Sequence, residues 1–262
     1  MSAISPVRLK QDIADLLETL PDEEGFERRL DDLLDRYADR TYRKAESGRP
    51  GSLLQAYHVS RPVLRGMAVG LAGYAEAAPE AALALADRLW GKPVFEPKYL
   101  AARVLGDLPG AFAGGVMERL AVWLAEADDD ALQAELVRVG LAVDEVGLAM
   151  IIESFMDEVG VGYLTALSAL GALAGNASTE ALPWIYRLFG KALENPAANR
   201  NARLINLARG LAQRAPVETA HFLRHQYLLT RQPEVSRILR QALPLFPDQL
   251  RKDIRRMLRE NQ

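Results

Sequence analysis

Apolar residues recur at intervals of three and four positions along most of the chain, which is the spacing of one face of an α-helix. The clearest stretch is LALADRLWGKPVFEPKYLAARVLG, residues 83–106, where Leu85 and Leu89 precede Gly91 and Leu100 follows it. This pattern predicts two amphipathic helices joined by a turn, with Gly91 as the left-handed residue that follows the first helix. Such a pair buries its apolar faces only when further pairs stack on both sides of it.

The same spacing continues on either side of this stretch, interrupted by prolines, glycines and an acidic cluster. It predicts one helix that begins after Ser60 and thirteen others, which span residues 6–20, 22–46, 79–90, 96–107, 112–126, 129–142, 144–158, 162–174, 179–192, 198–213, 217–229, 233–243 and 248–260. No run of alternating β-branched residues is convincing, so we expect an all-α protein.

The first two helices form a charged pair that we expect to cap the N-terminal end of a stack. The segment ESGRPGS at 46–52 is rich in glycine and proline and is the clearest loop in the chain. We therefore expect an N-terminal helical cap at residues 1–50 and a repeat body at residues 51–262, packed together as one domain.

Pairs of predicted helices begin at nearly regular intervals. They start near residues 61, 96, 129, 162, 198 and 233, with steps of 35, 33, 33, 36 and 35 residues. This regularity favours a right-handed α-solenoid. Residues 102–130 and 167–193 each resemble a HEAT unit, with an Ala/Leu-Gly first helix and a widely spaced Leu/Trp second helix. The ordered Trp, Leu-Gly, Tyr and Ala pattern of tetratricopeptide repeats is absent.

Composition excludes several kinds of protein. The 262 residues are 49% hydrophobic and 26% charged, which is typical of a globular chain. The absence of cysteine excludes disulfides, thiolate metal sites and cysteine nucleophiles. The N-terminal residues do not form a secretory signal, and no apolar run approaches the roughly 20 residues needed to span a bilayer. We expect a cytoplasmic protein with no membrane partner.

The net charge of −3 hides an uneven distribution. Residues 51–183 hold 8 Lys and Arg against 17 Asp and Glu, whereas residues 184–262 hold 15 against 6. A basic end of this kind is suited to a polyanion, because arginine pairs with phosphate through two parallel hydrogen bonds. The alternative is a solvated basic face that balances the acidic middle of the chain.

The basic residues of the C-terminal part fall into two groups. One occurs where helices of the last two repeats begin or turn outward, and comprises Arg200, Arg203, Arg214, Arg237 and Arg240. The other crowds the final predicted helix, and comprises Arg251, Lys252, Arg255, Arg256 and Arg259. If the first group lines a concave groove, phosphate binding follows. If it is scattered over the convex face, these arginines only aid solubility.

Two segments resemble the DNA alkylation repair family, the HEAT-like-repeat DNA glycosylases. They are YHVSRPVLRGMA at 57–68 and LADRLWGKPVFEPKYLAARVLG at 85–106. The residues that match are Tyr57, Val59, Pro62, Leu64, Arg65, Leu89, Trp90, Glu96, Ala101 and Leu105. Residues 208–223 and 236–243 also resemble closing repeats of that family. The resemblance implies a curved solenoid whose basic groove, to which Arg65 belongs, holds duplex DNA without a cofactor.

The resemblance also locates the place of the family's catalytic residues. Active members carry a Trp and, four residues later, an Asp that offsets positive charge as an alkylated base leaves. The corresponding segment here is AVDEVGLA at 142–149. Val143 stands in the position of the Trp and Gly147 in the position of the later Asp, whereas Asp144 is retained. The family's aromatic residue followed by paired arginines is missing from residues 162–170. We therefore expect DNA binding without efficient base excision.

The remaining chemistry-bearing residues support weaker hypotheses. Asp144 and Glu153 are candidate replacement carboxylates, and the alternative for both is a solvated acidic face with Asp144 as a helix cap. His221 and His225 share a helix face with Glu218, but the Glu that metalloproteases carry after the first His is absent, so we expect no metal. No phosphate-binding glycine loop or nucleophile-elbow serine occurs, and Trp90, Trp123 and Trp184 are expected in the core.

Three hypotheses remain. The favoured one is a HEAT-like protein that binds duplex or distorted DNA through its backbone. The second is a scaffold that binds a protein partner and has lost DNA affinity. The third is a divergent alkylpurine DNA glycosylase that uses Asp144 or Glu153.

Overall fold

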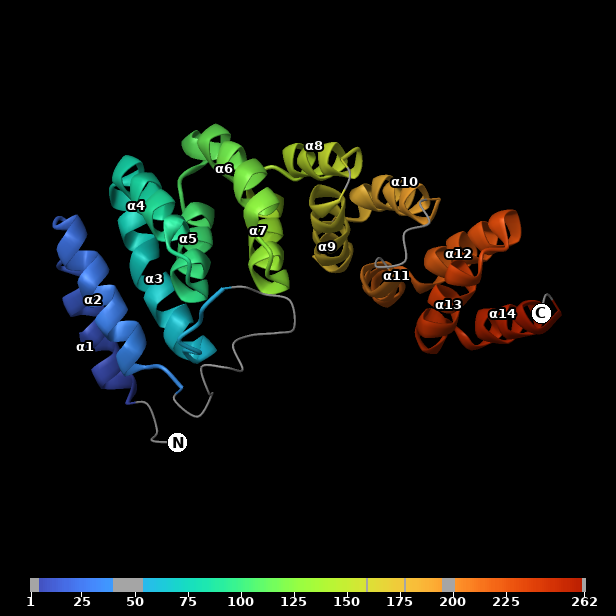
Figure 1. Ribbon diagram of the computed structural model, residues 1–262, viewed down its shortest axis with the longest axis horizontal. Coiled ribbons are helices and arrows are strands. Elements are labelled where there is room, and N and C mark those ends of the chain that lie inside the picture. The colour runs from blue at the N-terminus through green and yellow to red at the C-terminus, as the bar shows by residue number, and fades with distance from the viewer. Residues whose placement is uncertain (1–4, 40–53, 159, 177, 195–200, 261–262) are drawn as a thin grey trace. The chain divides into compact units, whose positions relative to one another are not determined.

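The computed structural model describes residues 5–39, 54–158, 160–176, 178–194 and 201–260. Within these residues the chain forms fourteen α-helices and three short 3-10 turns, and it contains no strand (Figure 1). A single isolated bridge pairs Gln55 with Val94 in the described part. The prediction of an all-α protein is therefore confirmed.

The chain divides into two compact units, Met1–Asp144 and Glu145–Gln262. The helices of the first unit are α1 (Pro6–Leu17), α2 (Glu23–Arg36), α3 (Arg61–Ala77), α4 (Pro79–Gly91), α5 (Phe95–Gly106), α6 (Ala113–Glu126) and α7 (Asp130–Val143). Those of the second unit are α8 (Glu145–Met156), α9 (Val161–Asn176), α10 (Leu182–Leu193), α11 (Asn201–Arg214), α12 (Pro216–Thr230), α13 (Pro233–Ala242) and α14 (Asp248–Glu260). The predicted boundary between cap and body, at residues 46–52, lies outside the described residues.

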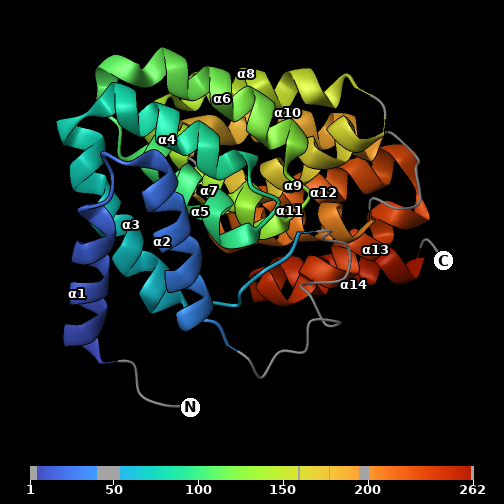
Figure 2. The same ribbon diagram turned by 60° about the vertical axis from the view of Figure 1, so that its left-hand side comes forward.

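Each unit is built from two layers of helices. In the first unit α1, α3, α5 and α7 pack against one another in that order, and α2, α4 and α6 cover them (Figures 1 and 2). In the second unit α9, α11 and α13 pack in succession, and α8, α10 and α12 lie against them, with α14 beside α12. Two-layer stacking of consecutive helix pairs is compatible with an α-solenoid.

Two glycines allow close packing of neighbouring helices in the first unit. A Cβ atom at Gly70 of α3 would lie 2.8 Å from Cγ2 of Ile13 on α1. A Cβ atom at Gly106 of α5 would lie 2.9 Å from Cγ2 of Val139 on α7. A larger residue at either position would force the helices apart, since interiors are close-packed.

Most predicted helix boundaries agree with the structure to within three residues, but the helix predicted at 22–46 is wrong at its C-terminal end. It stops at Arg36, and the described residues that follow are not helical. The apolar stripe of α2 is exhausted at Tyr37, so a longer helix would gain little from packing. Tyr37 turns toward α1 instead, where its hydroxyl donates to Oδ2 of Asp12 at 2.8 Å and Arg36 donates to Oδ1 at 3.0 Å.

The prediction that Gly91 is left-handed is also wrong. Gly91 is the last residue of α4, and Lys92 follows in an extended conformation with φ −74° and ψ 135°. Proline at 93 explains this, because the residue before a proline is disfavoured in the helical region. The Lys92 ammonium group then reaches α2, where it lies 3.0 Å from a carboxylate oxygen of Asp31.

A tryptophan pair fills the core between consecutive helix pairs of the first unit. Trp90 of α4 and Trp123 of α6 are stacked with ring centroids 4.4 Å apart and an interplanar angle of 1°. The indole nitrogen of Trp90 donates to Oε2 of Glu126 at 2.8 Å. The ammonium nitrogen of Lys98 lies 4.2 Å from the centroid of the Trp90 ring, a cation–π arrangement. Both tryptophans are buried, as expected.

A buried carboxylate holds the segment that leads into α3, which is neither helix nor strand and is left-handed at His58, with φ 57°. Glu96, in the first turn of α5, is 1% exposed. Its Oε2 accepts a hydrogen bond from the backbone N–H of Tyr57 at 3.0 Å, and its Oε1 accepts one from that of Val59 at 3.2 Å. The carboxylate thus replaces the partners that a helix or strand would give these two amides.

We expect Glu96→Gln to destabilise the first unit, because the new amide group directs N–H toward a backbone donor and leaves it unpaired. The expected loss in free energy of unfolding is about 1–3 kcal/mol. Urea unfolding measures it, and hydrogen exchange at the amides of Tyr57 and Val59 localises it. Glu80→Gln, at an exposed position on α4, is the matched control. Unchanged amide protection in Glu96→Gln would refute the role given to this carboxylate.

Candidate nucleic-acid interface

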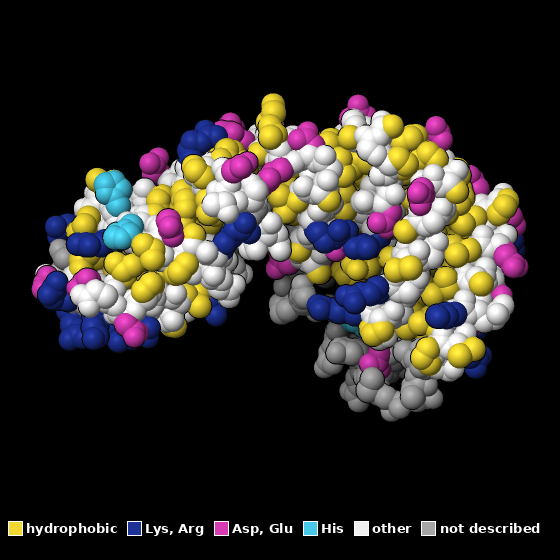
Figure 3. Space-filling view, turned by 180° about the vertical axis from the view of Figure 1, so that it is seen from behind, with side chains coloured by type: hydrophobic (Ala, Val, Ile, Leu, Met, Phe, Trp, Pro, Cys, Tyr) yellow, Lys and Arg dark blue, Asp and Glu magenta, His cyan; other side chains and the backbone are white. Residues whose placement is uncertain are grey.

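Arginine side chains gather along α13 and α14 of the second unit. Figure 3 shows Lys and Arg at the edge of this unit, at the lower left. Helix α13 buries Val235, Ile238 and Leu239 in the core, so Arg237 and Arg240 are left on its exposed side. The apolar face of one helix therefore fixes where its guanidinium groups emerge.

Helix α14 repeats this arrangement. Its buried residues are Ile254, Met257 and Leu258. Arg255 and Arg259 are four residues apart and exposed, so they lie one above the other on the same side of the helix.

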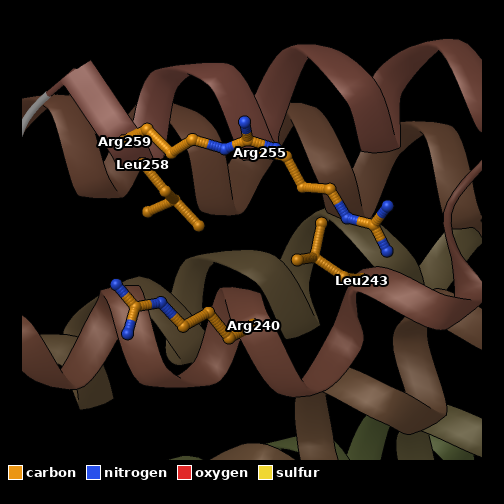
Figure 4. A pocket seen from close by; sticks show the side chains of 5 residues that line it. All are labelled: Arg240, Leu243, Arg255, Leu258 and Arg259. Carbon is orange, nitrogen blue, oxygen red and sulfur yellow. The ribbon is translucent and has the colours of Figure 1, made fainter.

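The two helices enclose a small hollow between these arginines. It measures about 230 Å³ and is lined by Arg240, Leu243, Arg255, Leu258 and Arg259. Figure 4 shows Arg240 on α13 and both other arginines on α14, with Leu243 and Leu258 directed into the space between the helices. We call it the end pocket.

A second hollow of about 490 Å³ adjoins the end pocket through Arg240, which lines both. Its other lining residues are Tyr227, Arg231, Pro233, Ser236, Arg237 and Gln241. We call the two hollows together the arginine groove.

Four arginines of the groove have no acidic partner. Among the described residues, no carboxylate lies within ion-pair distance of Arg237, Arg240, Arg255 or Arg259. Two other arginines of α14 differ, since Arg251 pairs with Asp248 and Arg256 with Asp253 in the same helix. Unpaired guanidinium groups keep their donors available for an external anion.

The groove has the chemistry of a phosphate site. Arginine stays charged throughout the physiological pH range and presents its donors in a planar fork that matches phosphate. Leu243 and Leu258 form the apolar part of the lining of the end pocket. The groove is therefore our candidate for nucleic-acid contact.

The predicted phosphate-binding residues are only partly brought together. Arg237 and Arg240 line the groove. Arg203 of α11 instead donates from Nε to Oγ of Ser168 at 2.7 Å, and Arg214 is exposed at the end of α11. Arg65 is exposed on α3 of the first unit, and Arg200 lies outside the described residues.

Sequence reasoning did not select Arg231, Arg255 and Arg259 as site residues. The signal that existed was the four-residue spacing of Arg255 and Arg259 next to Leu258 on an amphipathic helix. This signal does not identify the partner helix, because no local pattern indicates that α14 lies opposite Arg240.

The carboxylates of α8 hold neighbouring elements of the second unit. Both oxygens of Glu153 bind Arg187 of α10, each at 2.9 Å. Asp157 pairs with Lys191, also of α10. Oε1 of Glu145 accepts the backbone N–H of Ser178 at 3.0 Å, just before the 3-10 turn Thr179–Ala181.

This arrangement decides what Glu153 can do. The hydrogen bonds from Arg187 lower its pKa, so the carboxyl group is ionised near neutral pH and is not a proton donor. Asp144 has a different environment: it is exposed directly after α7, in an extended conformation with φ −157° and ψ 96°. Val143 and Gly147, which replace the family's catalytic pair, are both half-buried.

Histidine and tryptophan positions add no second site. His221 and His225 are both exposed on α12, and Trp184 is half-buried on α10. In the part of the chain that is described, no cluster of His, Asp and Glu has the arrangement of a metal site. The described helices also include none with the length and apolarity required to cross a bilayer.

Comparison with known proteins identified no relative. No family model matches the chain, and neither the curated proteins nor the solved structures include a match.

We expect Arg187→Gln to raise the pKa of Glu153 toward its ordinary value. The ion pair lowers that pKa in the folded protein, so its stabilising effect is present at neutral pH and is lost as the pH falls through the folded-state pKa. Carboxyl-carbon NMR titration measures the shift. Lys191→Gln is the control, since Lys191 contributes less to this pKa and should change it less. An unmoved pKa in Arg187→Gln would disprove the assignment.

Proposed function

We propose that the protein is a DNA-binding HEAT-like α-solenoid, related to alkylpurine DNA glycosylases, that holds the phosphate backbone of duplex or distorted DNA without efficient base excision. The observation that carries this proposal is the arginine groove of α13 and α14, in which four guanidinium groups have no acidic partner among the residues that the structure describes.

Charge and geometry both favour a polyanion. Residues 184–262 carry a net charge of +9, from 15 Lys and Arg against 6 Asp and Glu. Phosphate contacts by arginine supply sequence-independent affinity and fix the register of the nucleic acid. The proposed recognition is of the DNA backbone and of DNA shape, which needs no contact with base edges.

Two features support the proposed absence of efficient excision. Val143 and Gly147 provide neither an aromatic face nor a carboxylate. Glu153 is already paired with Arg187 through both of its oxygens. Asp144 is the retained carboxylate of the resembled motif, so it is the residue to test for residual activity.

A protein-binding scaffold is the second candidate function. Its specific support is the exposure of Val146 and Met150, at 71% and 68%, on one side of α8. Exposed apolar side chains four residues apart on a helix are suited to contact with a protein surface.

We expect the protein to bind duplex DNA with an affinity that falls steeply as salt rises, and Arg237→Gln/Arg240→Gln to weaken this binding about tenfold or more. The double variant should also reduce the slope of log affinity against log salt by about two, because each lost phosphate contact releases about one counterion fewer. Fluorescence anisotropy on plain and branched duplexes measures both quantities.

The control for that experiment is Arg209→Gln/Arg224→Gln, which removes the same charge from exposed positions outside the groove. It should retain affinity close to that of the unmodified protein. Equal weakening by both double variants would show that net charge, not the groove, binds DNA. An absence of salt-sensitive binding at low ionic strength would reject the DNA-binding proposal.

We expect no release of alkylated purine from methylated DNA above the spontaneous rate. The released bases are measured by chromatography on the same preparation that binds DNA. Enzyme-dependent release that disappears in Asp144→Asn would instead establish the divergent glycosylase.

A further inference from the structure

We propose that the end pocket binds the terminal phosphomonoester of a nucleic-acid strand, with the rest of the strand continuing along the second hollow of the arginine groove. This inference rests on the proposed function and specifies which part of the nucleic acid the site selects.

Three arginines, from the two helices that flank it, line the end pocket. Arg240 approaches from α13, and Arg255 and Arg259 approach from α14 (Figure 4). Among the described residues none of the three has a carboxylate partner. The volume of about 230 Å³ equals roughly seven or eight liquid-water volumes of about 30 Å³, which suits one hydrated phosphate group.

Three cations match a phosphomonoester better than a phosphodiester. A phosphomonoester carries about −1.5 to −2 charges near neutral pH and has three terminal oxygens that accept hydrogen bonds. A phosphodiester within a strand carries one charge and has two such oxygens. Only the monoester therefore gives each guanidinium group a terminal oxygen of its own.

The apolar wall of the end pocket disfavours polar groups other than the phosphate. Leu243 and Leu258 line it and offer no hydrogen-bonding side chain. Base edges or peptide groups would find no partners on this wall, and burying them unpaired is unfavourable. The phosphate group is thus the part of a ligand that the pocket accommodates.

The second hollow indicates that the phosphate belongs to a nucleic acid. It extends from Arg240 to Arg237 and Arg231, and adds the polar side chains of Ser236 and Gln241. A strand brings a further phosphate with each nucleotide and matches this continued positive charge. A phosphopeptide bears no such series of charges, so we favour a strand end over a phosphorylated protein.

The experiment compares oligonucleotides of one sequence that carry a 5′-phosphate, a 3′-phosphate or hydroxyl groups at both ends, each with an internal fluorescent label. We expect one of the two phosphorylated forms to bind about tenfold more tightly than the hydroxyl form, as charge-assisted hydrogen bonds permit. Arg255→Gln/Arg259→Gln should remove this preference, so that the phosphorylated and hydroxyl forms bind with similar affinity.

The matched control is Lys252→Gln/Arg256→Gln, which removes the same charge from the same helix at exposed positions outside the pocket. It should retain the preference. Three of the four substituted residues are arginines and the fourth is Lys252. All four are exposed on α14, and circular dichroism verifies that both variants keep their helices.

The pH dependence provides an independent signature. The second proton of a phosphomonoester leaves near pH 6, while arginine does not titrate in this range. The preference for the phosphorylated end should therefore be small at pH 5 and reach its full value by about pH 7.5.

Each contrary outcome has a distinct meaning. Binding of all three oligonucleotides with equal affinity would overturn the end-binding inference and leave the proposed function standing. Absence of binding to any of them at low salt would overturn both. Tighter binding of a phosphoserine peptide of matched length than of the phosphorylated oligonucleotides would overturn the inference in favour of a protein ligand.

Discussion

The buried carboxylate of Glu96 fixes how the chain enters α3. The segment before α3 is neither helix nor strand, so its backbone amides lack the partners that a helix would supply. Glu96 gives Tyr57 and Val59 those partners from the first turn of α5, and the amide of Phe95 donates to the carbonyl oxygen of Gln55 at 2.9 Å. The start of α3 is thus tied to the start of α5, and α1 and α7 pack on the outer sides of that pair.

The residues that carry the resemblance to DNA alkylation repair proteins have clear structural roles. Glu96 binds two amides, and Trp90 stacks on Trp123 while its indole nitrogen binds Glu126. Packing of consecutive helix pairs accounts for both residues. Their roles in the structure therefore concern the packing of the first unit.

The helices were predictable because their signal is local. Apolar spacing and proline positions locate thirteen of the fourteen to within about three residues, and α2 fails where its apolar stripe ends at Tyr37. The site was only half predictable because its partners are remote in sequence. Arg237 and Arg240 were selected from charge, but the facing Arg255 and Arg259 depend on how α14 folds back. Glu153 meets Arg187 across 34 positions, which no short motif records.

The parallel indoles of the first unit also have a practical consequence. The chain has three tryptophans, and two of them form this stacked pair beneath the Lys98 ammonium group. The third, Trp184, belongs to the second unit and is half-buried on α10. The intrinsic tryptophan fluorescence therefore comes from both units of the chain. Replacing Trp184 by phenylalanine leaves a spectroscopic probe of the first unit alone, so the order in which the halves melt is accessible without an added dye.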